Sequence, residues 1–319
     1  MSRSSCPTQN RMNVAFFILS ACFLLVMCSW NRCAHAEAET SAVTPAPSRI
    51  IVFPLYAEEI LLDLVEPDRI VYVGHQNIDE DGNAYSPTMH LTQGIPGSTW
   101  QNCGEEYLVD LNPDLIILDS DLFRDYQAIF PSLAQTNATF LFLDTPTSFD
   151  EIKSTILRLG QVVGHEAKAQ RLVEKFDAEL SVIGDLVQQI PMEKRARVVY
   201  YEAYASPLLP VIAQAAGVIL FPPDEVSDAS IARWNPDMIC FCPYGLDTDG
   251  SLYVTGDEYV ASCYSQIITN PVLCNVKAVQ AKRIFPLSIY ESQYAALSVK
   301  TLFAIAYPDM LSACSGILP

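Results

Sequence analysis

The sequence predicts an α/β protein with two similar lobes, each built on a parallel-type sheet flanked by helices. One long α-helix joins the lobes, and a ligand cleft lies between them. Short apolar runs rich in Val, Ile, Phe and Tyr alternate with helical stretches, which is typical of parallel sheets. One strand-and-helix pattern occurs in both halves of the chain, and a helical stretch, 149–189, separates the two copies. A helix in this position, in place of a Gly/Ser-rich linker, indicates lobes held at nearly fixed spacing.

The apolar runs define the expected strands, because each is bounded by turn residues and enriched in β-branched or aromatic side chains. The runs are 49–55, 69–75, 115–120, 139–144, 197–203, 238–242 and 283–287. The helical stretch 149–189 is interrupted near 160–164. Its second part places apolar residues at three- and four-residue spacing, as one buried face of a long helix requires. These residues are Leu172, Phe176, Leu180, Ile183 and Val187.

The repeated unit consists of an Arg, a β-branched run, a helix and an Asn-Pro-Asp triplet that leads into a buried strand. Arg69 precedes the triplet at 112–114, and Arg197 precedes the triplet at 235–237. Proline disfavours helical backbone in the residue before it, so each helix ends at the triplet. We therefore expect Arg69 and Arg197 to begin equivalent units in the two lobes.

The N-terminal residues differ in composition from the rest. Arg3 and Arg11 precede the apolar run 14–28, and Ala34 and Ala36 form a small-x-small site. This pattern predicts a secretory signal peptide cleaved after Ala36, and therefore a periplasmic protein. A membrane anchor, which needs about 20 apolar residues, and lipid attachment at the membrane through Cys28 are the alternatives. The expected divisions are a signal peptide 1–36, a linker 37–48, an N-terminal lobe 49–147, connecting helices 148–190 and a C-terminal lobe 191–319.

The charge and the cysteine content of the chain narrow its possible partners and its expected covalent cross-links. A formal net charge of −18 and an isoelectric point near 4.5 argue against binding to nucleic acid, because a basic surface is missing. The cysteines that follow the signal peptide are Cys103, Cys240, Cys242, Cys263, Cys274 and Cys314. In an exported chain we expect disulfides from Cys240 or Cys242 to Cys263 or Cys274, with buried thiols as the alternative.

Four motifs occur in a characteristic order: "STWQNCGEEYLVDLNPDLII" at 98–117, the long helix, "NPDMI" at 235–239, and "NVKAVQAKRIFPL" at 275–287. Together they resemble the periplasmic substrate-binding proteins of ABC importers, of the rigid class that handles vitamin B12, ferric siderophores and haem. The resemblance implies a monomer that holds its ligand between two lobes with little closure. It also implies delivery to an ABC permease and its ATPase, with no resident cofactor and no catalytic residues.

Several residues are candidate ligand contacts. Trp100 falls where the vitamin B12-binding relative places an indole, and an indole offers a large stacking surface at little entropic cost. In the preceding loop, Tyr85, Met89 and His90 carry the oxygen, sulfur and nitrogen atoms that ligate haem iron. Tyr204 follows a predicted strand end in the second lobe. The alternative to ligand contact is that Trp100 packs in the core and that the other candidates are ordinary loop or strand residues.

The resemblance also implies permease-docking residues. In the family, a surface Glu stands seven residues before the Pro of each strand-leading triplet. That position is Glu106 in the first lobe, but it is Ala229 in the second, where Asp228 is the nearest carboxylate. The alternative for Glu106 is a helix-dipole role, since acidic residues are favourable in a first turn.

Other functional classes lack support in the sequence. No G-x-S-x-G, H-E-x-x-H or glycine-rich phosphate loop is present, and only His75, His90 and His165 follow the signal peptide, so we predict that the chain is not an enzyme. A Zn²⁺- or Mn²⁺-binding importer protein would need several histidines and a carboxylate in the cleft, and is the alternative function. Corrinoid, ferric siderophore and haem all remain open. Arg124 and Arg233 are the nearest cations to the expected cleft loops, which disfavours an anionic triscatecholate.

Overall fold

The computed structural model describes residues 46–74, 86–97, 104–121, 124, 126–201, 206–246, 253–254 and 256–312. All of them belong to one compact unit, Ala46–Pro319. The predicted signal peptide and most of the predicted linker lie outside the described residues. None of the helices in the described ranges is long and apolar enough to cross a bilayer.

The first sheet has the strand order β2-β1-β3-β4, and all its strands are parallel. The strands are β1 Ile50–Val52, β2 Ile70–Val73, β3 Leu115–Asp119 and β4 Thr139–Leu143. Alternate residues face two apolar clusters: Ile50 and Val52 point to one side, and Ile51 points to the other. Burial on both faces explains why these strands read as continuous apolar runs in the sequence. The helices of this part are α2 Leu55–Leu64, α3 Glu105–Asp110 and α4 Tyr126–Ile129.

The second sheet is also fully parallel, with the order β10-β7-β5-β6. Its strands are β5 Arg197–Tyr200, β6 Ile219–Leu220, β7 Met238–Phe241 and β10 Ile284–Pro286. A small antiparallel pair, β8 Gly245–Leu246 and β9 Tyr253–Val254, lies apart from it. The helices are α7 Leu209–Ala215, α8 Asp228–Trp234, α9 Asp257–Thr269, α10 Lys277–Gln280, α11 Ala295–Ala306 and α12 Pro308–Ser312. Short 3-10 helices occur at η1 Pro67–Arg69, η2 Met89–Leu91, η3 Leu133–Gln135, η4 Met192–Lys194 and η5 Pro223–Glu225.

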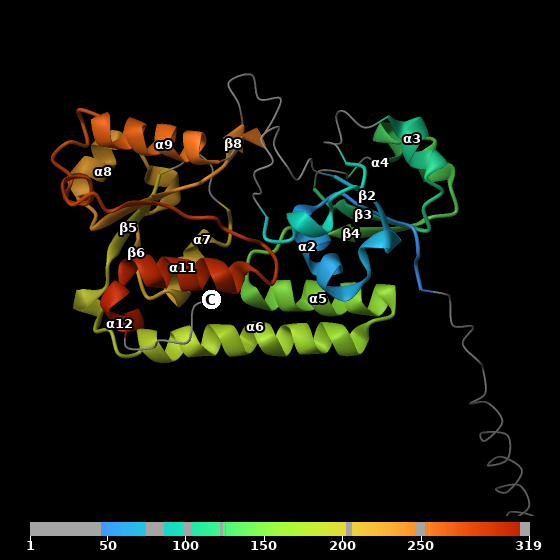
Figure 1. Ribbon diagram of the computed structural model, residues 1–319, viewed down its shortest axis with the longest axis horizontal. Coiled ribbons are helices and arrows are strands. Elements are labelled where there is room, and N and C mark those ends of the chain that lie inside the picture. Colours follow the sequence, from blue (N-terminus) through green and yellow to red (C-terminus); the bar gives the residue numbers. More distant parts are fainter. Residues whose placement is uncertain are drawn as a thin grey trace, which may run out of the picture. The chain divides into compact units, whose positions relative to one another are not determined.

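The predicted helical stretch forms two helices, α5 Phe149–Val163 and α6 Glu166–Val187. Gly164 ends α5 with a φ of 75°, a conformation that glycine adopts without steric cost. The helix α6 packs beside α5 and α11 (Figure 1) and also contacts α7, while α5 contacts α2. A single apolar cluster therefore includes residues from both sheets and from these helices. The predicted two-sheet α/β architecture is confirmed.

The internal repeat is confirmed, but the predicted alignment of its two copies is wrong. Each sheet has its first strand, β1 or β5, between its second and third strands, so the counterpart of Arg197 is Arg49 and not Arg69. The Arg49 guanidinium donates to the carbonyl oxygen of Leu111, and Arg197 donates to that of Trp234 at 2.6 Å. Each Arg thus binds the carboxyl end of the helix before the Asn-Pro-Asp triplet. Arg69 was predicted because it is the nearer of the two arginines to the first triplet in the sequence. The order of strands within a sheet cannot be read from a single sequence.

The expected disulfides are also wrong for the described cysteines, because Cys240, Cys242, Cys263 and Cys274 are thiols. Cys240 and Cys242 share one face, as predicted from their spacing, and belong to the apolar cluster that spans both sheets. Cys263 packs against the cluster on the opposite face of the second sheet. The sheet itself therefore separates Cys263 from the other two. Burial raises the pKa of Cys240 to about 12, so its thiol stays protonated.

Candidate functional site

Polar side chains from both lobes gather at the carboxyl ends of the two parallel sheets. Asp119 ends β3, Asp144 and Thr145 follow β4, Ser206 lies after β5, and Glu291 lies after β10. Tyr56, in the first turn of α2, completes the group. We call these six residues the interlobe cluster. Open parallel sheets bind ligands at this edge, so the cluster marks the candidate site.

The interlobe cluster is held by short side-chain hydrogen bonds within each lobe. The Thr145 hydroxyl donates to Asp119 Oδ2 at 2.9 Å, and the Ser206 hydroxyl donates to Glu291 Oε1 at 2.7 Å. Burial raises the pKa of Glu291, and the charge of Asp119 in the other lobe raises it further, against the hydrogen bond from Ser206. The two carboxylates are therefore close enough to interact across the lobes.

Tyr56 connects the acids of the two lobes. Its side chain is buried, and the Thr145 hydroxyl is the hydrogen-bonding group that acts on its own hydroxyl. Burial raises its pKa, and Asp119, Glu291 and Asp144 raise it further, while the nearby Thr145 hydroxyl opposes the shift. Asp144 is exposed, and Asp119 and Glu291 are half-buried. Solvent, and therefore a ligand, can reach the carboxylates that surround this buried hydroxyl.

A second contact between the lobes lies deeper and centres on Glu59 of α2, which is 1% exposed. Its carboxylate accepts hydrogen bonds at 2.5 Å from Ser86 and at 2.5 Å from Ser292 of the other lobe. Gln293 donates to the Glu59 carbonyl oxygen and to Asp63 of the same helix. Burial raises the pKa of Glu59 to about 7, opposed by the hydrogen bonds from Ser292 and Ser86. This contact ties α2 to the segment that precedes α11.

The second lobe adds tyrosines beside these acids. Burial raises the pKa of Tyr244 and of Tyr290, and the charge of Glu59 contributes to both shifts. The Tyr290 ring lies 6.2 Å from that of Tyr294, edge to face. The described part of the site therefore combines carboxylates with phenol rings. Within the described ranges, no group of three or more His, Cys, Asp or Glu side chains could hold a metal ion.

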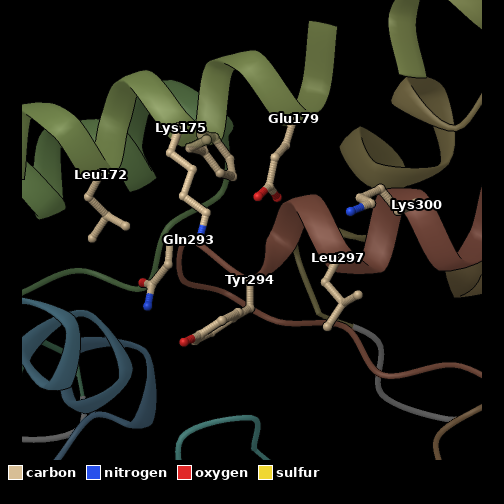
Figure 2. Close-up of a pocket in the computed structure, with 8 residues that line it drawn as sticks. Leu172, Lys175, Glu179, Gln293, Tyr294, Leu297 and Lys300 are labelled. Carbon is tan, nitrogen blue, oxygen red and sulfur yellow. The ribbon is translucent and has the colours of Figure 1, made fainter. Parts of the chain in front are cut away.

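A pocket of about 170 Å³ lies between α6 and the start of α11. It is lined by Leu172, Lys175, Phe176, Glu179, Gln293, Tyr294, Leu297 and Lys300. Figure 2 shows Lys175 and Glu179 extending from α6, with Lys300 on α11 beside them. The pocket shares Gln293 and Tyr294 with the Glu59 contact, but it includes no residue of the interlobe cluster.

The predicted ligand contacts fall mainly outside this description. Trp100, Tyr85 and Tyr204 lie outside the described residues. Met89 and His90 form the short helix η2, and nothing is described for the Met89 side chain. The His90 side chain is exposed, with its Nδ1 atom 3.2 Å from the Pro87 carbonyl oxygen.

The two predicted docking carboxylates differ in their surroundings. Glu106 is exposed in the first turn of α3. Its neighbour Glu105 accepts hydrogen bonds from the backbone N–H groups of Ser132 and Leu133, so the pair divides into one structural and one solvent-facing carboxylate. Asp228 is half-buried, and both its oxygens accept hydrogen bonds, from the Tyr201 hydroxyl at 2.7 Å and from Asn270 at 2.8 Å.

Sequence analysis did not select the residues of the interlobe cluster, although a signal for two of them was present. Asp119 and Asp144 each follow directly on an apolar strand run, and polar residues at strand carboxyl ends are expected near a ligand. Ser206 follows the same predicted strand end as Tyr204, which was preferred to it. Tyr56 and Glu291 carry no such signal, because their position depends on how the two lobes meet.

Known proteins share this fold. The haem-binding protein RhuT from Roseiflexus sp. RS-1 superimposes with a TM-score of 0.62 at 18% identity, over 82% of this chain and 99% of that one. The molybdate-binding protein MolA from Haemophilus influenzae gives 0.64 at 16% identity, over 85% and 90%. CeuE from Helicobacter pylori, solved as a Ni-His complex, gives 0.61 at 16% identity, over 84% and 85%.

Sequence comparison is more specific than these structural likenesses. No curated protein matches the chain. Residues 57–289, which run from α2 to just beyond β10 and leave out β1, match the description "Periplasmic binding protein". This match confirms the resemblance inferred from the motifs. The chain belongs to the periplasmic binding protein family.

Proposed function

We propose that the chain captures an iron chelate or a corrinoid, that is a ferric siderophore, haem or cobalamin, and delivers it to an ABC permease and its ATPase. The observation that carries this proposal is the interlobe cluster, which places polar groups of both lobes at the carboxyl ends of two parallel sheets in a periplasmic binding protein. Binding without covalent chemistry is the expected mode. RhuT, which shares this fold, is described as haem-binding, and this description supports the proposal.

The ligand-contacting residues of this proposal are Trp100, Tyr85, Met89, His90 and Tyr204. An indole and phenol rings stack on flat macrocycles or aromatic chelating groups, and the remaining side chains suit a metal that is already chelated. The exposed His90 ring is available to a ligand. The interlobe cluster would form the base of the same cleft.

Two features support a mode of binding with little closure of the lobes. The helices α5 and α6 belong to an apolar cluster that includes residues of both sheets, and Glu59 is hydrogen-bonded to both Ser86 and Ser292. Opening the lobes would expose part of this cluster and break the Glu59 contact, both of which cost free energy. The division into lobes at 49–147 and 191–319, with connecting helices 148–190, is part of this proposal.

Docking to the permease would use Glu106 on the first lobe and Asp228 on the second. The exposure of Glu106 supports its role directly. Asp228 would have to exchange its bonds to Tyr201 and Asn270 for a permease cation. The protein would act in the periplasm as a monomer, exported by the signal peptide, with a lipid anchor at Cys28 as the alternative.

Ligand titration followed by tryptophan fluorescence tests the proposal. The protein to use is residues 37–319, in which the compact unit Ala46–Pro319 is intact. Cobalamin, haem, ferric siderophores and Zn²⁺ are the ligands. Trp100→Phe removes the proposed contact, and Trp234→Phe is the matched control, because Trp234 packs against Phe221 and the Arg197 guanidinium.

Saturable quenching by one chelate or corrinoid, weakened by Trp100→Phe and retained in Trp234→Phe, is the expected result. Saturation by Zn²⁺ alone would instead identify a metal-ion-binding protein. Failure of every ligand to bind would overturn the proposal.

A further inference from the structure

We propose that the pocket between α6 and the start of α11 is a second small-molecule site, which takes a small organic carboxylate with an apolar body. The pocket includes no residue of the interlobe cluster, so this ligand would be additional to the cargo of the cleft. The volume of the pocket is about 170 Å³. A cavity of about 150 Å³ between apolar side chains holds a benzene molecule, so the space suits a body of about six carbon atoms.

The inner surface of the pocket is apolar. The lining residues of α6 are Leu172, Lys175, Phe176 and Glu179, and their three- and four-residue spacing places them on one face of the helix. Phe176 is 2% exposed, while Leu172 and Leu297 are half-buried. These side chains, together with the Tyr294 ring, offer a surface on which an apolar body can be removed from water.

Three charged groups lie around this apolar surface. Figure 2 shows Lys175 and Glu179 extending from α6 and Lys300 extending from α11. None of the three forms an ion pair with another described residue. Glu179 and Lys300 are half-buried, and a charge that is partly removed from water costs free energy unless it is paired. A ligand carboxylate that accepts from Lys175 and Lys300 would supply the missing partner.

The wall formed by Gln293 and Tyr294 is held in place by contacts behind it. The Gln293 amide donates to the Glu59 carbonyl oxygen at 3.0 Å and to Asp63 Oδ2 at 2.9 Å. The Tyr294 hydroxyl donates to the same Asp63 oxygen at 3.4 Å, and the Tyr294 ring packs edge to face against Tyr290. Side chains that are already ordered lose little entropy when a ligand binds. The wall is therefore formed before the ligand arrives.

Glu179 determines how much negative charge the ligand can carry. Two ammonium groups and one carboxylate leave an excess of positive charge at the pocket, in a chain whose net charge is −18. A single ligand carboxylate balances this excess. A dianion would meet repulsion from Glu179, and a cation would meet two groups of its own charge. The charges of the lining therefore favour a monoanion.

Isothermal titration calorimetry with three probes tests the charge and the apolar body separately. Phenylacetate carries both, phenylacetamide has a similar shape without the charge, and acetate is the charged group alone. The proteins are residues 37–319 of the wild type, the double variant Lys175→Gln with Lys300→Gln, and Glu179→Gln. Lys194→Gln is the matched control, because Lys194 is exposed on η4 and does not line the pocket.

Phenylacetate should saturate the wild-type protein and bind about tenfold or more tightly than phenylacetamide, as charge-assisted hydrogen bonds imply. Acetate should bind more weakly than phenylacetate, because it buries no ring. The double variant should lose the preference for phenylacetate, while Lys194→Gln retains it. Glu179→Gln should strengthen phenylacetate binding about two- to fivefold, as removal of one partly exposed like charge implies. Circular dichroism checks that each variant is folded, and the single lysine variants serve where the double variant is not.

Three results would contradict the proposal. One is failure of phenylacetate to saturate the wild-type protein. Another is equal affinity for phenylacetate and phenylacetamide, which would leave only an apolar gap between two helices. The third is a preference for phenylacetate that survives in the double variant, which would place the carboxylate elsewhere in the protein. None of these results bears on the titration with cobalamin, haem and ferric siderophores, so failure here is distinguishable from failure of the proposed function.

Discussion

Glu59 shows how a single residue links the two lobes. It lies on α2 among residues that are almost all buried, and its carboxylate bridges Ser86 and Ser292. Other titratable groups face it from the surrounding elements: Glu291, Asp63, Tyr244, Tyr290 and Tyr294. A carboxylate at this depth is costly when charged, so the protonation of Glu59 is coupled to folding.

The first prediction is that Glu59 makes stability decrease as pH rises. Its folded-state pKa, about 7, is raised above the unfolded value, which is about 4.3. The fold therefore favours the protonated form. The stabilising contribution is complete below the unfolded pKa and is lost as pH rises through the folded pKa. Glu59→Gln should remove a pH-dependent change in the free energy of unfolding of roughly 3–4 kcal/mol in total.

Urea unfolding at several pH values between 4 and 8 checks this prediction. The difference between wild type and Glu59→Gln should change across this range. Glu66→Gln, at an exposed position, is the control substitution. A constant difference for Glu59→Gln would show that its carboxylate titrates normally.

At the scale of elements, the Asn-Pro-Asp triplets end helices and begin strands by the same means in both lobes. Asn112 and Asn235 adopt φ values of 48° and 54°, which Asn tolerates better than most residues. The aspartates then bind the backbone N–H groups of the neighbouring strand: Asp114 binds that of Arg49, and Asp237 that of Arg197. The repeated motif is therefore a joint between helix and strand.

The second prediction concerns Asn112, whose exposed side chain leaves the backbone conformation as its main role. Asn112→Ala should lower the free energy of unfolding by about 1 kcal/mol, because Ala pays more than Asn for left-handed backbone. Asn112→Gly should be neutral or slightly stabilising at the same position. Chemical denaturation of both variants distinguishes this explanation from loss of a side-chain contact, which would destabilise both.

The third prediction concerns the close approach of α5 and α6. A Cβ atom at Gly160 would lie 2.3 Å from the Ala169 Cβ atom, whereas one at Gly184 would meet nothing within 4 Å. Gly160→Ala should therefore destabilise the protein by about 1–3 kcal/mol through overpacking. Gly184→Ala should be neutral or stabilise it by up to about 1 kcal/mol, since Ala is the better helix former. Thermal unfolding compares them, and similar effects of the two substitutions would contradict the predicted clash.

For the whole molecule, the important separation is between ligand capture and delivery. The interlobe cluster and the proposed contacts around Trp100 concern capture. Glu106 lies in the first turn of α3, next to Glu105. The Glu105 carboxylate accepts hydrogen bonds from backbone N–H groups at the start of η3. An exposed carboxylate on a helix that is held in place in this way can contact a partner without taking part in ligand binding.

The fourth prediction is that Glu106→Ala lowers uptake through the cognate permease by about tenfold, as for an interface charge pair, while ligand affinity stays unchanged. Asp110→Ala is the control, because Asp110 is an exposed acid on the same helix. Uptake of labelled ligand by cells and affinity of the purified protein are measured in parallel. Equal loss of uptake and affinity would assign Glu106 to the ligand site instead.

The sequence alone determined the features that depend on local chemistry. It identified the seven longer runs that form strands, because they are apolar and bounded by turn residues. It located the interruption between α5 and α6, where Gly164 adopts left-handed backbone. It also identified the helix ends at the two Asn-Pro-Asp triplets. The strands β6, β8 and β9 were missed because two-residue strands have no periodicity to detect.

The tertiary structure alone decided the features that depend on contacts between distant segments. Arg49 and Arg197 occupy equivalent positions in the two repeats because of the strand order in each sheet. Cys263 is separated from Cys240 because the two residues lie on opposite faces of one sheet. The convergence of Tyr56, Asp119 and Glu291 requires both lobes to be in place. One sequence carries no record of which distant residues meet, because lobe packing is set by the sum of many weak apolar contacts rather than by any local motif.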